Sequence, residues 1–376
     1  MMKIVFCHLL NDFSGSPKVL RDTISALKGE AKNEKLYVSG NTDGFLSDCQ
    51  ISRGRYWYIR SQNKFVTLFT FFFSQVCLFF KLLCDRSIAS DAIIYVNTLL
   101  PFGAAIYGKL TGRLVIYHVH EISIRPAPLR YFLVSLVRWT SSLNMYVSKA
   151  HMQLLPIPGV KSRCIYNALD HFFEEKGWSS VYQSHRQGVF NILMIASLRD
   201  YKGIVELIAL VNSLSGRIDI HFDLVINGDQ CEIDAYFSDT SCPSQLTVHP
   251  RTLNTPAYYA EASLVLSLAR VDLWQETFGL TVLEAITFGI PVIVPPVGGP
   301  AEIIRDGVEG FLIDSRDTDR VRTHVLRLVD DAVLCHRMSE AARLRAKDFM
   351  RDKFIAEMNA VIMDIRASRS ATIRNE

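Results

Sequence analysis

Short apolar runs rich in β-branched and aromatic residues alternate with segments of helical length through the first half of the chain. They predict strands at residues 3–9, 35–38, 56–59, 92–96, 113–117, 144–147 and 161–165, with helices at 17–28, 65–84, 100–111 and 127–142. Ser16 followed by Pro17 is a favourable N-cap and first position for the first helix. Strands separated by helices are typical of βαβ units, so we expect a parallel sheet.

The alternation stops at residues 171–188, which show no regular period, and then starts again. The second half has predicted strands at 191–196, 221–226, 246–249, 264–268, 291–294 and 310–313, and predicted helices at 203–213, 232–240, 280–287 and 317–330. We therefore predict an α/β protein with two Rossmann-like, doubly wound parallel-sheet domains that face a central cleft. The expected parts are domain 1–170, linker 171–188, domain 189–350, and a C-terminal helix, 351–376, that packs back on the first domain.

The composition is typical of a packed soluble protein. Of 376 residues, 49% are hydrophobic and 21% charged, which argues against a disordered or fibrous chain. The eight cysteines include no CxxC pair, so neither a zinc cluster nor a disulfide framework is indicated. The first ten residues lack the apolar run and cleavage site of a signal peptide. We therefore expect a cytoplasmic protein.

The charge is distributed unevenly along the chain. Residues 1–170 hold 20 Lys and Arg against 10 Asp and Glu, a net charge of +10, whereas the remainder holds 21 against 28, a net charge of −7. The basic half is expected to face an anionic partner, such as a phosphate, a nucleic acid or a lipid headgroup surface. Charge alone does not choose among these.

Residues 65–84 form an apolar stretch, and about 20 such residues are long enough to cross a bilayer. Ser74, Gln75 and Lys81 interrupt it, so a membrane span is not expected. Two interpretations stay open. The stretch is either a helix buried between the sheet and its neighbours or, because basic and aromatic residues crowd positions 53–64, a helix lying on a membrane surface.

Two glutamates flank a glycine in the most informative segment of the second half. Gly279 precedes a predicted helix that begins near Leu280, and the free amides of a helix N-terminus attract phosphate. Glu276 lies before this helix and Glu284 inside it, roughly 12 Å apart if the segment were wholly helical. Carboxylates repel phosphate, so we expect both to accept hydrogen bonds from neutral sugar hydroxyls. The alternative is a solvated helix charge, which would be costly in the apolar run around Glu284.

This segment resembles the retaining family-4 glycosyltransferases, also called glycosyl transferases group 1, which have the GT-B fold. The resemblance rests on the two glutamates with seven residues between them, followed by Gly-Ile-Pro-Val-Ile at 289–293 and Gly-Gly-Pro-Ala-Glu at 298–302. Further matching stretches lie at 192–203, 224–229 and 306–313, and thinner ones at 15–16, 118–121, 147–149 and 167–170.

The resemblance implies roles for particular residues. His120 lies near the transferred sugar, Lys202 binds phosphate, and these two with Glu276 are the implied catalytic residues. Glu276 holds the donor sugar and Glu284 the nucleotide ribose. Arg199 is expected to replace an arginine that many relatives carry two positions earlier. The implied donor-binding residues are Gly15, Ser16, Arg199, Lys202, Glu276, Phe278, Gly279, Leu280 and Glu284.

Each weaker signal has a structural alternative. His120 could be a polar residue at a strand end, and Lys202 a surface lysine before a glycine turn. Residues 103–109 have the spacing of a P-loop, but Leu110 replaces the metal-binding hydroxyl, so a buried helix is expected. The Asp-Thr-Asp at 317–319 is explained as a helix N-cap. No GxGxxG motif follows the first strand, which argues against a dinucleotide dehydrogenase.

The resemblance implies a retaining, metal-independent hexosyltransferase that moves a sugar from a nucleotide-diphosphate donor to a glycan or lipid-linked acceptor. We expect a role in bacterial surface polysaccharide biosynthesis (O-antigen, capsule or lipopolysaccharide), with no cofactor, no metal and no nucleic-acid partner. Peripheral contact with the inner face of the cytoplasmic membrane is expected from the basic half. The alternatives are a nucleotide-sugar epimerase or phosphorylase of the same fold, and a catalytically silent sugar-binding scaffold.

Overall fold

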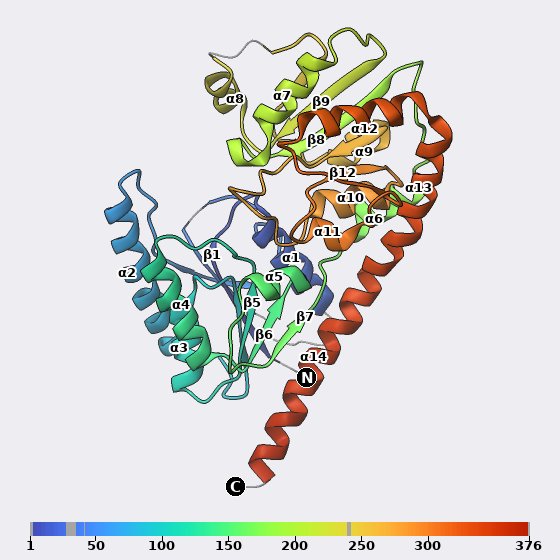
Figure 1. Ribbon diagram of the computed structural model, residues 1–376. Coiled ribbons are helices and arrows are strands. Elements are labelled where there is room, and N and C mark those ends of the chain that lie inside the picture. The colour runs from blue at the N-terminus through green and yellow to red at the C-terminus, as the bar shows by residue number, and fades with distance from the viewer. Residues whose placement is uncertain (1–2, 28–34, 41, 239–241, 375–376) are drawn as a thin grey trace. The chain divides into compact units, whose positions relative to one another are not determined.

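The computed structural model describes residues 3–27, 35–40, 42–238 and 242–374, and the chain divides into two compact units (Figure 1). One unit spans Met1–Asn167 and Asp352–Glu376, and the other spans Ala168–Arg351. Each unit has helices packed around a parallel sheet, which confirms the predicted fold class. Lys28 and Thr240, the expected ends of two helices, lie outside the described residues.

The first unit is built on a seven-stranded sheet in the order β3-β2-β1-β4-β5-β6-β7. Every pairing among its described strands is parallel. Strands β4, β5 and β6 are buried along their whole length, as expected when helices cover both faces of a parallel sheet. The strands are β1 (Ile4–Leu10), β2 (Lys35–Ser39), β3 (Ser52–Tyr56), β4 (Ile93–Asn97), β5 (Val115–Val119), β6 (Leu143–Tyr146) and β7 (Ser162–Cys164).

Helices α2, α3 and α4 lie side by side in the first unit (Figure 1). Gly103 lets α2 and α3 approach closely, because a Cβ there would lie 2.1 Å from the carbonyl oxygen of Gln75. The C-terminal helix α14 is tied to β7 by an ion pair between Arg163 and Asp364. The helices of this unit are α1 (Gly15–Leu27), α2 (Lys64–Cys84), α3 (Phe102–Leu110), α4 (Ala127–Thr140), α5 (Lys149–Leu154) and α14 (Arg351–Arg374).

The second unit has a six-stranded parallel sheet in the order β10-β9-β8-β11-β12-β13. Its strands are β8 (Phe190–Ala196), β9 (Ile220–Ile226), β10 (Leu246–His249), β11 (Leu264–Leu266), β12 (Val292–Val294) and β13 (Gly310–Leu312). Its helices are α6 (His171–Ser179), η1 (Asp200–Lys202), α7 (Ile204–Ser213), α8 (Gln230–Tyr236), α9 (Thr255–Glu261), α10 (Leu280–Thr287), α11 (Pro300–Ile303), α12 (Thr318–Asp330), α13 (Ala332–Ala346) and η2 (Lys347–Phe349).

The strand order reverses once in each sheet, between β1 and β4 in the first unit and between β8 and β11 in the second. In open α/β sheets, ligands bind outside the carboxyl ends of the strands at such a switch point. Ligand sites are therefore expected at the loops that follow β1 and β4, and at those that follow β8 and β11.

Three expectations need correction. The strand expected at 56–59 is β3, which runs from Ser52 to Tyr56 and pairs with β2. It is an edge strand of polar residues, and its Gly54 lies against the ring of Tyr37, so apolar alternation could not reveal it. Helix α1 begins at Gly15, so Ser16 lies inside it and is not its N-cap. Residues 171–188, expected to be a linker, lie in the second unit and begin with α6.

Two weaker signals have the structural explanation that was expected. The residues with P-loop spacing lie in α3, whose residues 102–105, 107 and 108 are buried. Asp317 is the N-cap of α12, and its side chain accepts a hydrogen bond from the amide of Arg320. Neither segment is a candidate ligand site.

Candidate functional site

A glycine allows the turn after β8 to lie directly against the segment after β11. Gly203 has a φ of +87°, and a Cβ at this position would lie 2.1 Å from the carbonyl oxygen of Leu268. A side chain is therefore excluded here both by backbone conformation and by space. Because of this contact, the preceding residue, Lys202, lies beside the segment that follows β11.

Lys202 forms an ion pair with Glu276, and both side chains are about one quarter exposed. The ammonium also lies 5.5 Å from the ring centre of Trp274 and 5.9 Å from that of Tyr201, within the range of a cation–π interaction. These two rings are stacked with their centres 5.1 Å apart. The backbone amide of Arg270 donates to the carbonyl of Tyr201 at 2.9 Å and joins the two loops. Lys202 is thus held by a carboxylate and two aromatic rings.

The loop from Glu276 to Gly279 is fixed by two further glycines. The amide of Gly299 donates to the carbonyl of Glu276 at 2.9 Å, and a Cβ on Gly299 would lie 2.2 Å from the Cα of Phe278. A Cβ on Gly298 would lie 2.6 Å from the carbonyl oxygen of Glu276. The Gly-Gly-Pro segment found in the sequence therefore holds the carboxylate loop in position.

Helix α10 begins directly after this loop, and no side chain caps its N-terminus. Gly279 is the N-cap with a φ of +100°, a conformation that favours glycine, and Leu280 is the first helical residue. The first amides of a helix have no partner inside the helix, and they carry the positive end of its dipole. The end of α10 beside Glu276 thus has the chemistry of an anion site.

Glu284 lies inside α10 and is 5% exposed. Its Oε2 accepts a hydrogen bond of 2.7 Å from the hydroxyl of Tyr259 in α9. Burial, reinforced by the Glu284 carboxylate, raises the pKa of Tyr259 well above its usual value, so this hydroxyl remains a donor. Tyr259 was missed in the sequence because no local pattern links α9 to α10.

Arg199 is exposed beside the same turn. Its backbone amide donates to the carbonyl of Ser197 at 2.7 Å. No described residue forms a hydrogen bond or an ion pair with its guanidinium group. The structure therefore places a second cation three residues before Lys202, at the carboxyl end of β8.

In the first unit, Asn97 at the end of β4 joins two predicted site segments. The Nε2–H of His120, which directly follows β5, donates to Asn97 Oδ1 at 3.0 Å. The Asn97 amide group donates to the carbonyl of Ser16 in α1 at 3.1 Å. A Cβ on Gly15, the first residue of α1, would meet nothing within 4 Å. Gly15, Ser16 and His120 therefore gather at the switch point of this sheet.

Burial sets the protonation of the residues around His120. Burial, with smaller contributions from His118, His151 and His8, lowers the pKa of His120 well below its usual range, so the ring is neutral. The carboxylate of Glu121 accepts hydrogen bonds from the amides of Leu99 at 3.0 and 3.2 Å and of His120 at 3.2 Å. Burial raises the pKa of Glu121 to about 7.

His118 is fully buried and hydrogen-bonds to the hydroxyl of Tyr95 at 2.7 Å, which is typical of a structural histidine. Burial lowers its pKa to about 3. His8 and His151, which the sequence analysis did not single out, belong to the same cluster, and burial lowers the pKa of each to about 4. The four histidines come from β1, β5, the loop after β5, and α5, so only the fold brings them together.

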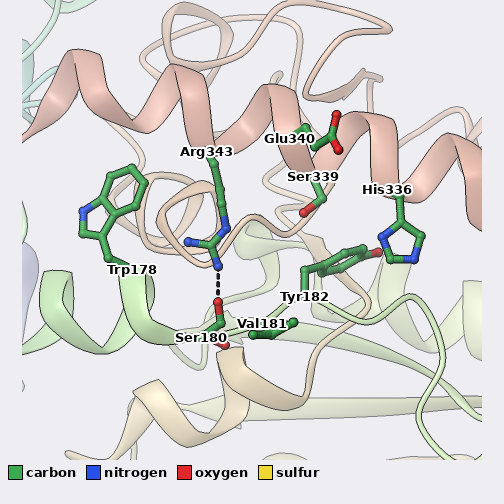
Figure 2. Close-up of a pocket in the computed structure, with 8 residues that line it drawn as sticks. All are labelled: Trp178, Ser180, Val181, Tyr182, His336, Ser339, Glu340 and Arg343. Carbon is green, nitrogen blue, oxygen red and sulfur yellow. Dashed lines mark hydrogen bonds between the residues drawn. The ribbon is translucent and has the colours of Figure 1, made fainter.

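A pocket of about 460 Å³ lies elsewhere in the second unit (Figure 2). Arg343 of α13 is its central side chain, and its guanidinium group donates to the carbonyls of Gly177, Ser180 and Phe288. The arginine thus fastens α13 to neighbouring segments. The pocket contains none of the predicted site residues. Its lining is Trp178, Ser180, Val181, Tyr182, His336, Ser339, Glu340 and Arg343.

The predicted site residues fall into two groups. One group lies in the second unit, around Lys202 and the start of α10, and consists of Arg199, Lys202, Glu276, Phe278, Gly279, Leu280 and Glu284. The other, in the first unit, consists of Gly15, Ser16 and His120. Among the residues that the structure describes, no three His, Cys, Asp or Glu side chains are grouped so that they could hold a metal ion.

Comparison with known proteins finds a family match within the second unit. Residues 183–345 match the family model of the glycosyl transferases group 1. N-acetyl-alpha-D-glucosaminyl L-malate synthase from Bacillus anthracis is 26% identical over 176 residues, 46% of this chain and 45% of that enzyme. D-inositol 3-phosphate glycosyltransferase from Salinispora arenicola is 36% identical over 101 residues, 27% of this chain and 22% of that enzyme. The chain thus matches less than half of the length of these relatives.

Solved structures extend the likeness to nearly the whole chain at the level of fold. Anabaena Alr3699/HepE in complex with UDP and glucose superimposes with a TM-score of 0.77 and 19% identity, covering 97% of this chain and 100% of that one. The lipopolysaccharide outer core galactosyltransferase WaaB superimposes with a TM-score of 0.71 and 14% identity, covering 96% of this chain and 99% of that one. Residues 183–345 thus resemble the glycosyl transferases group 1, and the chain has the GT-B fold.

Proposed function

We propose that this protein is a retaining glycosyltransferase that moves a hexosyl group from a nucleotide-diphosphate sugar to a glycan or lipid-linked acceptor. The observation that carries the proposal is the pairing of Lys202 with Glu276 beside the uncapped N-terminus of α10. A cation, a carboxylate and a helix N-terminus at a switch point are suited to a diphosphate with a sugar attached. The match of this unit to the group 1 family supports the same conclusion.

Stabilising the leaving diphosphate is the main task in such a reaction. The bond between the anomeric carbon and the diphosphate breaks, and the electron pair stays on the phosphate oxygen. Lys202, Arg199 and the first amides of α10 at Gly279 and Leu280 would stabilise this charge. In the proposed mechanism they take the place of a metal ion.

The sugar and the ribose would be held by the carboxylates. Glu276 would accept hydrogen bonds from hydroxyls of the transferred sugar, and Glu284 from those of the ribose. Backbone groups of Gly15 and Ser16 would contact the diphosphate, and the neutral ring of His120 would form a hydrogen bond with the sugar. Phe278 is buried, so it would contribute by anchoring the loop that carries Glu276.

The acceptor hydroxyl would attack on the face from which the diphosphate leaves, which retains the anomeric configuration. Its proton would pass to an oxygen of the departing phosphate, so no side chain is required as a base. No cofactor and no nucleic acid enter this scheme. A role in bacterial surface polysaccharide biosynthesis would place the enzyme in the cytoplasm, in peripheral contact with the inner face of the membrane.

The test is to incubate the protein with UDP-glucose, other UDP-sugars and GDP-sugars, together with lipid-linked acceptors. UDP-glucose is a reasonable first donor because the similar fold of Anabaena Alr3699/HepE binds it. Transfer with retained configuration, seen by NMR, and its loss in Glu276→Gln would support the proposal. Isomerisation of the donor would indicate an epimerase, release of a sugar phosphate a phosphorylase, and donor binding without turnover a scaffold.

A further inference from the structure

Helix α2 has one face packed in the first unit and one face left open. The packed face consists of Thr70, Phe71, Ser74, Gln75, Leu78 and Leu82. Along the rest of the helix, nine large apolar side chains are between 37% and 84% exposed, with Phe65 and Phe69 the most open. Residues 65–84 are therefore only partly buried, because one third of the most apolar window of the helix is buried.

The helix is long and apolar enough to cross a membrane by length and composition, but its packed face argues against a span. The side-chain carbonyl of Gln75 accepts a hydrogen bond of 3.2 Å from the amide of Gly103. Phe71 packs edge-on against Phe102, with ring centres 5.7 Å apart. If α2 crossed a membrane, it would lose these contacts, and the face of the sheet that it helps to cover would be exposed. These contacts favour a helix that stays on the surface of the first unit.

The open face continues beyond α2 onto a neighbouring helix and the preceding segment. The ring of Phe72 packs against Phe132 of α4 at 5.5 Å, and Trp57 packs against Phe73 at 5.4 Å. Tyr131 and Trp139 of α4 are exposed as well. We call this surface the aromatic face and define it by six exposed residues, Trp57, Phe65, Phe69, Phe73, Tyr131 and Trp139.

The charges in the stretch of chain that carries the aromatic face are mostly positive. Residues 50–140 contain 11 Lys and Arg against three Asp and Glu. Of the three acids, Asp85 is paired with Lys35, and the Glu121 carboxylate is bound by backbone amides. Arg60, which precedes α2, and Lys64, its first residue, are exposed. Exposed aromatic residues with a basic border are typical of interfacial helices that bind anionic lipids.

We propose that the aromatic face docks on an anionic lipid bilayer, with α2 lying in the plane of the interface. This inference rests on the proposed function, because a lipid-linked acceptor would be the reason for the enzyme to bind a membrane. A second copy of the chain is less suitable as the occupant, because it would bring the two basic borders together without counter-charge.

The test is co-sedimentation of the full chain with vesicles of phosphatidylcholine alone or mixed with phosphatidylglycerol, at low and high salt. One variant changes Phe65, Phe69 and Phe73 to Ser, and a second changes Arg60 and Lys64 to Ser. The control changes three exposed apolar residues of the second unit, Ile218, Leu253 and Val333, to Ser. All these side chains lie at the surface, so the variants should fold.

The wild type and the control should bind the anionic vesicles, and salt should weaken the binding. The aromatic variant should bind at least tenfold less because apolar burial is lost, and the basic variant about 25-fold less at roughly fivefold per charge. Equal binding by the aromatic variant and the wild type overturns the proposal. So does a wild type that ignores anionic vesicles and instead forms a dimer, by analytical ultracentrifugation, that the aromatic variant loses.

UDP binding by the same variants separates this inference from the proposed function. Loss of vesicle binding with retained UDP affinity is the result expected of the aromatic variant. A wild type that binds UDP and transfers sugar but ignores vesicles would refute the docking face alone. A wild type that binds vesicles but no nucleotide sugar would refute the glycosyltransferase proposal alone.

Discussion

The ammonium of Lys202 is paired with the carboxylate of Glu276, although 74 residues separate them in the sequence. The pair connects the turn after β8 to the loop after β11, the two strands between which the sheet reverses its order. Gly203 permits this approach on one side, and Gly298 and Gly299 fix the loop on the other. The two side chains with proposed roles toward phosphate and sugar therefore occupy one small volume.

Lys202→Ala should lower turnover about 100- to 1000-fold, because the lysine would act on charge that develops as the diphosphate leaves. The free energy of unfolding should change by about 1 kcal/mol or less, since partly exposed ion pairs contribute little. Steady-state transfer assays and urea unfolding measure the two effects. Lys347→Ala, at an exposed lysine in η2, is the control and should change neither. Unchanged turnover in Lys202→Ala would assign the role to Arg199 or to backbone amides.

Glu284→Gln should lower nucleotide affinity about 10- to 150-fold, because a charge-assisted hydrogen bond to the ribose contributes roughly 1.5–3 kcal/mol. The fold should survive, since the glutamine oxygen can still accept from Tyr259. Isothermal titration with UDP gives the affinity. The control is Glu340→Gln, at an exposed residue of α13, which should bind UDP as the wild type does.

Tyr259→Phe distinguishes a ligand role for Glu284 from a purely structural one. Removal of the hydroxyl should lower the free energy of unfolding by about 1–3 kcal/mol, because it withdraws a donor from a buried carboxylate. If Glu284 only fastened α9 to α10, Glu284→Gln would leave UDP affinity unchanged while Tyr259→Phe destabilised the protein. That combination would refute the ribose role.

The sequence was sufficient for the arrangement of the sheets and for the second-unit site. Alternating apolar runs predicted most strands within two residues, because buried parallel strands are continuous apolar segments. The loop from Glu276 to Gly279 and the Lys202 turn were found because their residues are consecutive. The glycines at 203, 298 and 299 have the backbone roles that such residues usually signal.

Contacts between distant segments could not be predicted in the same way. Tyr259, Trp274 and the histidines His8 and His151 reach their partners only after the strands are ordered side by side. The open face of α2 was also undecided, because a helix that is apolar on all sides has no period that tells its packed face from its exposed one. The fold settles this, since Gly103 and Gln75 show which side meets α3.

Transfer activity should survive an excess of EDTA. In the proposed mechanism Lys202, Arg199 and the amides at the start of α10 stabilise the leaving diphosphate, so a divalent cation is not needed. The measurement is turnover after dialysis against EDTA, compared with parallel reactions that receive Mg²⁺ or Mn²⁺. Complete loss of activity that either ion restores would refute the metal-independent mechanism.

Acid should destabilise the first unit through its buried histidines. In the unfolded chain a histidine binds a proton below about pH 6.5, whereas burial holds the pKa of His8 and His151 at about 4 and that of His118 at about 3. Their stabilising contribution is therefore complete above pH 6.5 and is lost as the pH falls toward these values. Glu121, with its pKa raised to about 7, acts in the opposite direction and favours folding below that pH. Because the buried histidines outnumber this one glutamate, the free energy of unfolding should decrease as the pH is lowered from 6.5 to 5.

The substitution His118→Asn removes one of these titratable groups and so tests its contribution. Its amide oxygen can still accept from Tyr95, but it cannot titrate, so the dependence of the free energy of unfolding on pH between 4.5 and 6 should become shallower by about 1.4 kcal/mol per pH unit. Urea unfolding at several pH values measures the slope. His171→Asn is the matched control, because the His171 side chain is exposed and the substitution should leave the slope of the wild type unchanged. Equal slopes in His118→Asn and the wild type would mean that His118 is already protonated in the folded unit, and that the Tyr95 contact, rather than burial, governs its charge.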